Sequence, residues 1–111
     1  MKLEELVQRL ELEVQTAKGK LGVEVTGGYA SDLLSWVMAK AQAGNVWITI
    51  QAHSNIVAVA SLINLSGIIV AEGVTPELAT LEKADQEGIP ILTTQLPMYA
   101  VAGKMHELGI R

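Results

Sequence analysis

The sequence predicts one α/β domain over residues 1–111, with a mostly parallel sheet of about four to five strands and helices packed on it. Three observations predict this fold class. The chain has 111 residues, the size of one domain. Apolar residues make up 50% of it, so a core can form without a metal or a disulfide. Strand-like and helix-like segments alternate at a spacing of roughly 22 residues, as repeated strand–helix units do.

The N-terminal segment begins with a helix. Apolar residues from Leu3 to Leu10 recur at i, i+3, i+4 and i+7, which predicts an amphipathic helix. Residues 12–14 alternate between apolar and charged side chains and predict a short, half-exposed strand. A loop is expected at 17–20. Residues 23–25 then predict a strand that ends at Thr26-Gly27-Gly28.

Two further units are predicted in the middle of the chain. A helix is expected from about Ser31 until Gly44, followed by a strand over 46–50. The next helix is expected from Ser54 to Leu65, because its first residues are good N-caps. The first of these helices is expected to bury Leu33, Leu34, Val37, Met38 and Ala41.

The last units follow a continuously apolar strand at 67–71, as a central strand covered on both faces would be. Thr75-Pro76-Glu77 predicts a helix start, with a capping residue and a proline at the first helical position. A short strand over 89–92 and a final helix from Met98 to Leu108 complete the chain. The helix before that strand is expected to bury Leu78, Leu81 and Ala84 and to end at Gly88.

The predicted helix from Ser54 to Leu65 carries no charged residue on any side. A surface helix normally keeps a charged face, so this helix is expected to be buried all round. One interpretation is a two-fold homodimer that covers the helix with a second copy. The other is a central helix sandwiched within the monomer. The dimer would use Ile56, Val57, Val59, Ala60 and Ile63.

Composition excludes several kinds of site and partner. The chain has no cysteine, which removes disulfides, thiol nucleophiles and cysteine-ligated metals. A net charge of −4 argues against a nucleic-acid partner. The N-terminus lacks a signal-peptide pattern, and polar residues interrupt the longest apolar stretch, which argues against a membrane span. We therefore expect a cytoplasmic protein without nucleic-acid or membrane partners, and the sequence specifies no cofactor and no metal.

The candidate ligand site is the carboxyl edge of the predicted sheet, where ligands of open parallel sheets bind. Three of the four loops expected there run into helix N-termini, whose free N–H groups favour anions. The site therefore predicts a small anionic ligand. Its candidate residues are Thr26, Gly27, Gly28, Ser31, Asp32, Gln51, His53, Asn55, Glu72, Gly73, Thr93 and Thr94.

Individual residues of this edge have two interpretations each. Gly27-Gly28 suits either a close approach of backbone to an anion or a turn with positive φ. His53 is either a ligand contact that changes charge near neutral pH or a capping residue. Asp32 and Glu72 could pair with His53 in acid–base or metal chemistry, or serve their own helices. The chain contains no P-loop, G-x-S-x-G or H-E-x-x-H motif, and no catalytic residue is assigned.

Several runs of the sequence resemble the DRTGG domain family, especially its small free-standing members. They are residues 25–35, 47–51 with His53, 55–60 and 89–94, and together they span nearly the whole chain. Where the family has its Asp-Arg pair and Thr-Gly-Gly triplet, this chain has Ala52-His53 and Ala71-Glu72-Gly73. The resemblance implies an α/β fold and an accessory, ligand-sensing role. The family is similar to the N-terminal domain of HPr kinase, and the kinase half is not present here.

Two classes of function follow from these observations. The first is a non-catalytic regulatory module that binds a nucleotide or phosphometabolite at the carboxyl edge of the sheet. The second is an assembly subunit that binds a protein partner, which the resemblance weakly links to anaerobic hydrogenase metabolism. An enzyme that uses His53 with Asp32 or Glu72 is a third, more distant hypothesis.

Overall fold

A computed structural model describes residues 1–111 as a five-stranded sheet in the order β1-β5-β4-β3-β2. Four strands are parallel: β2 (Gly27–Ala30), β3 (Asn45–Thr49), β4 (Gly67–Val70) and β5 (Ile91–Thr93). The two-residue strand β1 (Glu13–Val14) lies antiparallel at the edge, with Glu13 opposite Thr93. The predicted α/β class with a mostly parallel sheet is confirmed.

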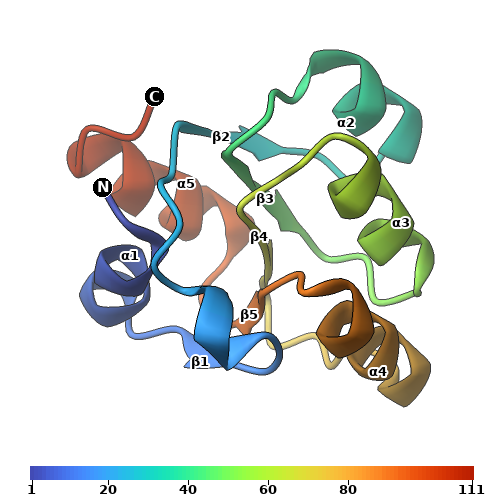
Figure 1. The fold of residues 1–111 in the computed structure, drawn as a ribbon. Helices are drawn as coiled ribbons and strands as arrows, with labels where there is room; N and C mark the ends of the chain where they lie inside the picture. The colour runs from blue at the N-terminus through green and yellow to red at the C-terminus, as the bar shows by residue number, and fades with distance from the viewer.

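Helices cover both faces of the sheet (Figure 1). On one face lie α1 (Leu3–Leu10) and α5 (Met98–Glu107), and on the other lie α2 (Leu34–Lys40), α3 (Asn55–Leu62) and α4 (Leu78–Glu87). A short 3₁₀-helix, η1 (Lys18–Lys20), follows β1. None of the five α-helices combines the length and the apolar character that crossing a membrane requires.

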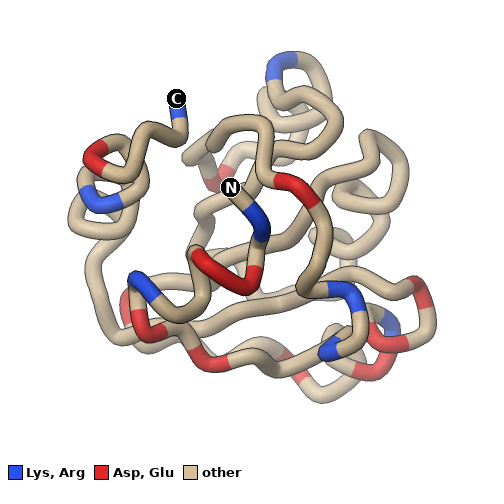
Figure 2. Tube along the Cα trace, turned by 60° about the vertical axis from the view of Figure 1, so that its left-hand side comes forward, with Lys and Arg blue, Asp and Glu red and all other residues tan.

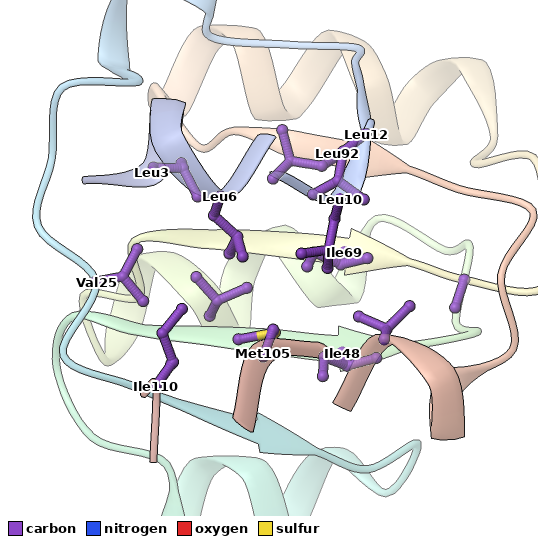
Figure 3. Packing of buried hydrophobic residues seen from close by; sticks show 13 residues of the cluster. Leu3, Leu6, Leu10, Leu12, Val25, Ile48, Ile69, Leu92, Met105 and Ile110 are labelled. Atoms are coloured by element: carbon purple, nitrogen blue, oxygen red, sulfur yellow. The ribbon is translucent and has the colours of Figure 1, made fainter. Parts of the chain in front are cut away.

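Strand alternation divides the interior into two cores. In β3, Val46 and Ile48 point into the core beneath α1 and α5, whereas Trp47 points into the core beneath α2, α3 and α4. Figure 3 shows Leu6 of α1 and Met105 of α5 meeting the sheet in the first core. The predicted continuous burial of the central strand is confirmed, since every residue of β4 is buried.

The predicted strand at 23–25, ending at Thr26-Gly27-Gly28, does not belong to the parallel sheet. Its backbone is extended, but Leu3 N donates to Val23 O at 2.9 Å and Val25 N donates to Met1 O at 2.8 Å. These residues therefore pair with the N-terminal segment. The strand that joins the parallel sheet begins at Gly27, opposite Asn45 of β3.

Helix α2 is shorter than predicted because its expected first turn has another role. The Ser31 hydroxyl oxygen accepts from Leu33 N at 3.0 Å, and the helix begins only at Leu34. Val37 is fully buried, whereas Leu33 and Met38 are 55% and 45% exposed. The prediction that both side chains are buried is therefore wrong.

Helix α4 likewise begins later than Pro76, at Leu78. Thr80 and Ala84, four residues apart, face the core and are fully buried. Leu78 precedes this stripe by two residues, which places it on the opposite side of the helix, where it is 72% exposed. The predicted burial of Leu78 is wrong, and that of Ala84 is confirmed.

Helix α3 is sandwiched within the monomer. It contacts α2 and α4 and packs on the sheet. The residues predicted to form a dimer interface are therefore turned inward: Ile56, Val57 and Ala60 have no exposed surface, Val59 is 5% exposed, and Ile63 packs against the same core. The assignment of these side chains to a dimer interface is wrong, because α2, α4 and the sheet cover them within one chain. The prediction that the helix is buried all round is also wrong, since Leu62 on its outer side is 67% exposed.

Candidate functional site

A cleft of about 660 Å³ opens at the edge of the sheet where β1, β4 and β5 reach their surrounding loops and helices. Its volume is within the range of sites for small molecules. Residues from both helical layers line it: Arg9, Leu10, Glu11, Glu13, Gln15, Gly73, Val74, Thr75, Pro76, Leu81, Thr93, Thr94, Gln95, Leu96 and Lys104.

Backbone hydrogen bonds join the β4–α4 and β5–α5 loops at this cleft. Glu72 N donates to Leu96 O at 2.9 Å, and Gly73 N donates to Thr94 O at 3.0 Å. Gly73 has a φ of +71°, and a Cβ at this position would lie 2.6 Å from Gln95 Oε1. The positive φ is the reason that favours glycine here, whereas the flexible end of the Gln95 side chain can move away from an added Cβ. The two backbone hydrogen bonds hold the loops that line the cleft together.

The lining residues come from opposite faces of the sheet. Leu92 and its partner Val14 belong to the α1/α5 side, so Thr93 and Glu13 point towards the side that carries α4. Val74 and Leu81 pack on that second side, whereas Leu10 and Leu96 pack with the α1/α5 core. The cleft thus passes around the edge of the sheet from one layer to the other.

Polar side chains of the cleft next to β1 and β5 use some of their hydrogen-bonding groups within the protein and leave others free. Gln15 Nε2 donates to Thr93 Oγ1 at 2.9 Å, and Thr94 Oγ1 accepts from Leu96 N at 3.1 Å. Each threonine hydroxyl accepts in these bonds and keeps its own proton for donation. The amide oxygen of Gln15 also remains a free acceptor.

Four charged side chains line the cleft without pairing. Arg9 and Lys104 are cationic, and Glu11 and Glu13 are anionic. The single ion pair of the structure joins the N-terminal amine to Glu24, 3.4 Å away, outside the cleft. A smaller hollow of about 130 Å³ borders Arg9 and Lys104 as well, together with Glu107. Figure 2 shows how charges concentrate on the segments of α1, β1, α4 and α5, whereas the stretch from 41 to 71 has none.

The structure brings three of the predicted ligand residues into the cleft: Gly73, Thr93 and Thr94. The others lie outside its lining. Among them, Asp32 joins the ends of β2 and β3. Its Oδ1 accepts from Thr49 Oγ1 at 2.7 Å and from Ile50 N at 2.8 Å, and Gln51 Nε2 donates to Asp32 O at 2.9 Å.

His53 and Glu72 each serve a neighbouring backbone. His53 Nδ1 accepts from Asn55 N at 3.2 Å, at the start of α3. Glu72 Oε2 accepts from Met98 N at 3.1 Å, at the start of α5. No hydrogen bond joins His53 to Asp32 or to Glu72, and no three potential metal ligands lie together. The acid–base or metal arrangement considered for these residues is not formed.

Thr26, Gly27 and Gly28 lie at the start of β2, which is the outer strand on the side of the sheet away from β1 and the cleft. The expectation that they end a strand at its carboxyl edge is wrong, because β2 begins at Gly27. Neither Gly27 nor Gly28 has a positive φ. A Cβ on Gly27 would lie 2.8 Å from Arg111 O, and one on Gly28 would lie 3.0 Å from Met105 Cε. At Gly27 the close neighbour is the backbone of the last residue, Arg111, so a side chain would require the chain to shift, whereas at Gly28 it is the flexible end of the Met105 side chain.

Sequence reasoning missed most of the cleft lining, including its two cations, Arg9 and Lys104. Each lies on a helix whose apolar stripe identifies the core face, and both are exposed. They line one space because α1 and α5 pack side by side on the same face (Figure 1). The contact between α1 and α5 depends on the strand order, which the periodicity of a single helix does not predict.

Structural comparison relates this fold to a regulatory region. The CBS and DRTGG domains of the regulatory region of a Clostridium perfringens pyrophosphatase, solved with the activator diadenosine tetraphosphate, match with a TM-score of 0.73 at 19% identity. The chain shares its fold with part of that region. The match covers 94% of this chain and 45% of the other, so this chain spans less than half of the matched protein. No sequence model of a family matches, and neither does any curated protein.

Proposed function

We propose that this chain is a non-catalytic regulatory module that binds a phosphate-bearing small molecule, a nucleotide or a phosphorylated metabolite, in the cleft. The observation that carries the proposal is the pair of cations, Arg9 and Lys104, which line a preformed cavity and have no acidic partner. Guanidinium and ammonium groups are the side chains that most often bind phosphate. The relation of the fold to a nucleotide-regulated region gives independent support.

Other hydrogen-bond donors of the cleft suit a phosphorylated ligand as well. The hydroxyl protons of Thr93 and Thr94 are free for donation, as their oxygens accept from Gln15 Nε2 and Leu96 N. Phosphate oxygens accept several hydrogen bonds at once, and hydroxyl and cationic donors can bind them together. We therefore include Thr93, Thr94 and the backbone at Gly73 among the ligand contacts.

The absence of an assembled catalytic group supports a non-catalytic role. Asp32, His53 and Glu72 each accept a hydrogen bond from a backbone N–H group, and these groups belong to Ile50, Asn55 and Met98. A general base must lie within hydrogen-bond reach of the proton that it removes and is usually oriented by another side chain. The side chains of these three residues instead hold backbone segments in place.

A thermal-shift and calorimetric screen tests the proposal. The panel holds tripolyphosphate, nucleoside mono-, di- and triphosphates, and sugar phosphates. A ligand at a hundred times its Kd should stabilise the fold by about 2.7 kcal/mol, and the double variant Arg9→Ala/Lys104→Ala should bind at least about tenfold more weakly.

The matched control removes two lysines outside the cleft, Lys2→Ala/Lys18→Ala, and changes the net charge equally. It should bind as the parent protein does. A panel that leaves the melting temperature unchanged, or a ligand that the Arg9/Lys104 variant binds at full affinity, contradicts the proposal.

A second candidate is an assembly role, favoured by apolar side chains exposed on α2 and α3. Leu33, Trp36, Met38 and Leu62 are 55%, 51%, 45% and 67% exposed, and Lys40, with its ammonium 4.9 Å from the Trp36 ring, is the charged residue beside them. Exposed apolar side chains that lie together mark protein interfaces. Self-association would use exposed side chains of α2 and α3 and not the buried side of α3.

Light scattering at micromolar concentration tests the second candidate. A dimeric mass for the parent protein and a monomeric mass for Trp36→Glu/Leu62→Glu would support it. Tyr99→Glu is the control, because Tyr99 is 92% exposed on α5, on the other face of the sheet. A monomeric parent protein contradicts self-association.

A further inference from the structure

The cleft carries both of its cations on the α1/α5 side of the sheet and the Glu13 carboxylate on the other side, with a second acid, Glu11, at the C-terminal end of α1. The separation of the cations from Glu13 restricts the ligand more than the presence of cations alone. Arg9 and Lys104 come from α1 and α5, on one face of the sheet. Glu13 lies on the edge strand and points to the other face, beside Thr93 and the apolar residues Val74 and Leu81. A small symmetric anion could occupy only the side with the cations.

The Glu13 end offers hydrogen-bond acceptors. The Glu13 carboxylate has no hydrogen-bond or ion-pair partner. The Gln15 side chain donates through Nε2 to Thr93 Oγ1, so the Gln15 Oε1 atom remains free to accept. Val74 and Leu81 provide aliphatic surface next to these acceptors. A planar group with N–H donors along one edge and an apolar face is complementary to this arrangement.

We propose, on the basis of the function proposed above, that the ligand is a guanine nucleotide, with its base at Glu13 and Gln15 and its phosphates at Arg9 and Lys104. Guanine presents two adjacent donors, the ring N1–H and the exocyclic amine, and a carboxylate can accept from both at once. Adenine presents one amine beside N1, an acceptor nitrogen that faces a carboxylate unfavourably. The elongated form of a nucleotide also fits a cleft that passes around the sheet edge.

Isothermal titration calorimetry with GTP, ITP, ATP and tripolyphosphate separates the contributions. ITP differs from GTP only by the missing exocyclic amine, and tripolyphosphate has no base. We expect GTP to bind about tenfold more tightly than ITP, since a hydrogen bond to a charged group is lost. ATP and tripolyphosphate should bind more weakly than GTP by at least that factor.

The variant Glu13→Gln tests the residue assigned to the base. It should weaken GTP binding about tenfold and leave tripolyphosphate binding unchanged. Because the Glu13 side chain is exposed and makes no hydrogen bond, the variant should fold as the parent does. Glu82→Gln, an exposed acid outside the cleft, is the control and should bind all four ligands like the parent.

The outcomes separate the two proposals. Equal affinity for GTP, ITP and tripolyphosphate, or tighter binding of ATP than GTP, overturns the guanine assignment and leaves the phosphate site in place. Unchanged GTP binding in Glu13→Gln overturns the role of that residue. Failure of all four ligands to bind, together with the rest of the phosphate panel, overturns the proposed function as well.

Discussion

Thr49 lies at the carboxyl end of β3 with no exposed surface, and its hydroxyl group donates to Asp32 Oδ1 at 2.7 Å. The same oxygen accepts from Ile50 N, so the carboxylate closes the end of β3 and fixes the β2–α2 loop against it. From the sequence, Asp32 was expected either to pair with His53 or to serve as an acid in the first turn of its own helix. Its true partner belongs to another strand, and only the pairing of β2 with β3 brings the two together.

Replacing Asp32 should lower stability. Asp32→Ala leaves the buried Thr49 hydroxyl without its acceptor, and we expect a loss of about 1 to 3 kcal/mol in the free energy of unfolding. The double variant Asp32→Ala/Thr49→Val removes the stranded hydroxyl and should lose less than the sum of the single changes. Urea denaturation measures all three. Fully additive losses would show that the two side chains do not interact.

Gly73 should tolerate a side chain poorly. Its φ of +71° and the nearby Gln95 Oε1 predict that Gly73→Ala lowers the free energy of unfolding by about 1 to 2 kcal/mol. The change should also weaken ligand binding, because Gln95 must move and lines the cleft. Gly103→Ala is the matched control: this glycine lies in α5 with nothing within 4 Å of an added Cβ, and the change should stabilise by about 0.5 to 1 kcal/mol. A stabilising Gly73→Ala would contradict the argument.

Helices and strands with a strong pattern of their own were predicted well. The apolar stripe gave α1 its full limits, Leu3–Leu10, and uninterrupted apolar residues identified β4 as a central strand. The predictions failed where a segment could pair in two ways. Residues 23–25 alternate like a strand, and their backbone does pair, but with Met1 and Leu3. Alternation of apolar and polar residues indicates an extended backbone, but it does not predict which segment pairs with that backbone.

The charge-free helix α3 illustrates the same limit. Its composition predicted burial on all sides, but only one side is buried, and Leu62 on the other side is 67% exposed. Two kinds of neighbour could provide the burial of the first side. The sequence left open whether a second copy or the monomer does so. In the structure, α2 and α4 flank the helix and the sheet lies beneath it. Whether the monomer or a second copy covers the buried side of α3 depends on how many helices lie on the same face of the sheet. That number follows from the order of the strands, which the sequence pattern of one helix does not reveal.

Truncating Ile56 should distinguish burial within the monomer from burial between copies. Ile56 has no exposed surface, and we expect Ile56→Ala to lower the free energy of unfolding by about 2 to 5 kcal/mol. The loss should be the same at all protein concentrations, because the contacts are made within one chain. Leu62→Ala on the exposed side of α3 is the control and should have little effect on the monomer's stability. A concentration-dependent loss for Ile56→Ala would place the residue between copies.

The order of the strands decides where a ligand site can form. The central position of β4 places its following loop beside the loop after β5, and the backbone bonds of Glu72 and Gly73 connect the two. The two-residue strand β1 ends the sheet and leaves space beside it, which becomes the cleft. The loops after β2 and β3 lie further along the same edge and are joined by Asp32. The carboxyl ends of the strands were predicted to form one ligand site. In the structure, Asp32 connects the loops after β2 and β3, and the cleft opens beside the loops after β4 and β5.

Hydrogen exchange measured by mass spectrometry can establish which of these two pairs of loops binds the ligand. The cleft draws its lining from β1, the β4–α4 loop and the β5–α5 loop, so bound GTP or tripolyphosphate should slow amide exchange at 11–15, 73–76 and 93–96. Peptides covering 51–55 and α2 should exchange at the rate of the free protein, because they lie outside the cleft. The Arg9→Ala/Lys104→Ala variant should show no slowing at the same ligand concentration. Protection centred on His53 and Asn55 instead would return the site to the β3–α3 loop, where the sequence alone placed Gln51, His53 and Asn55.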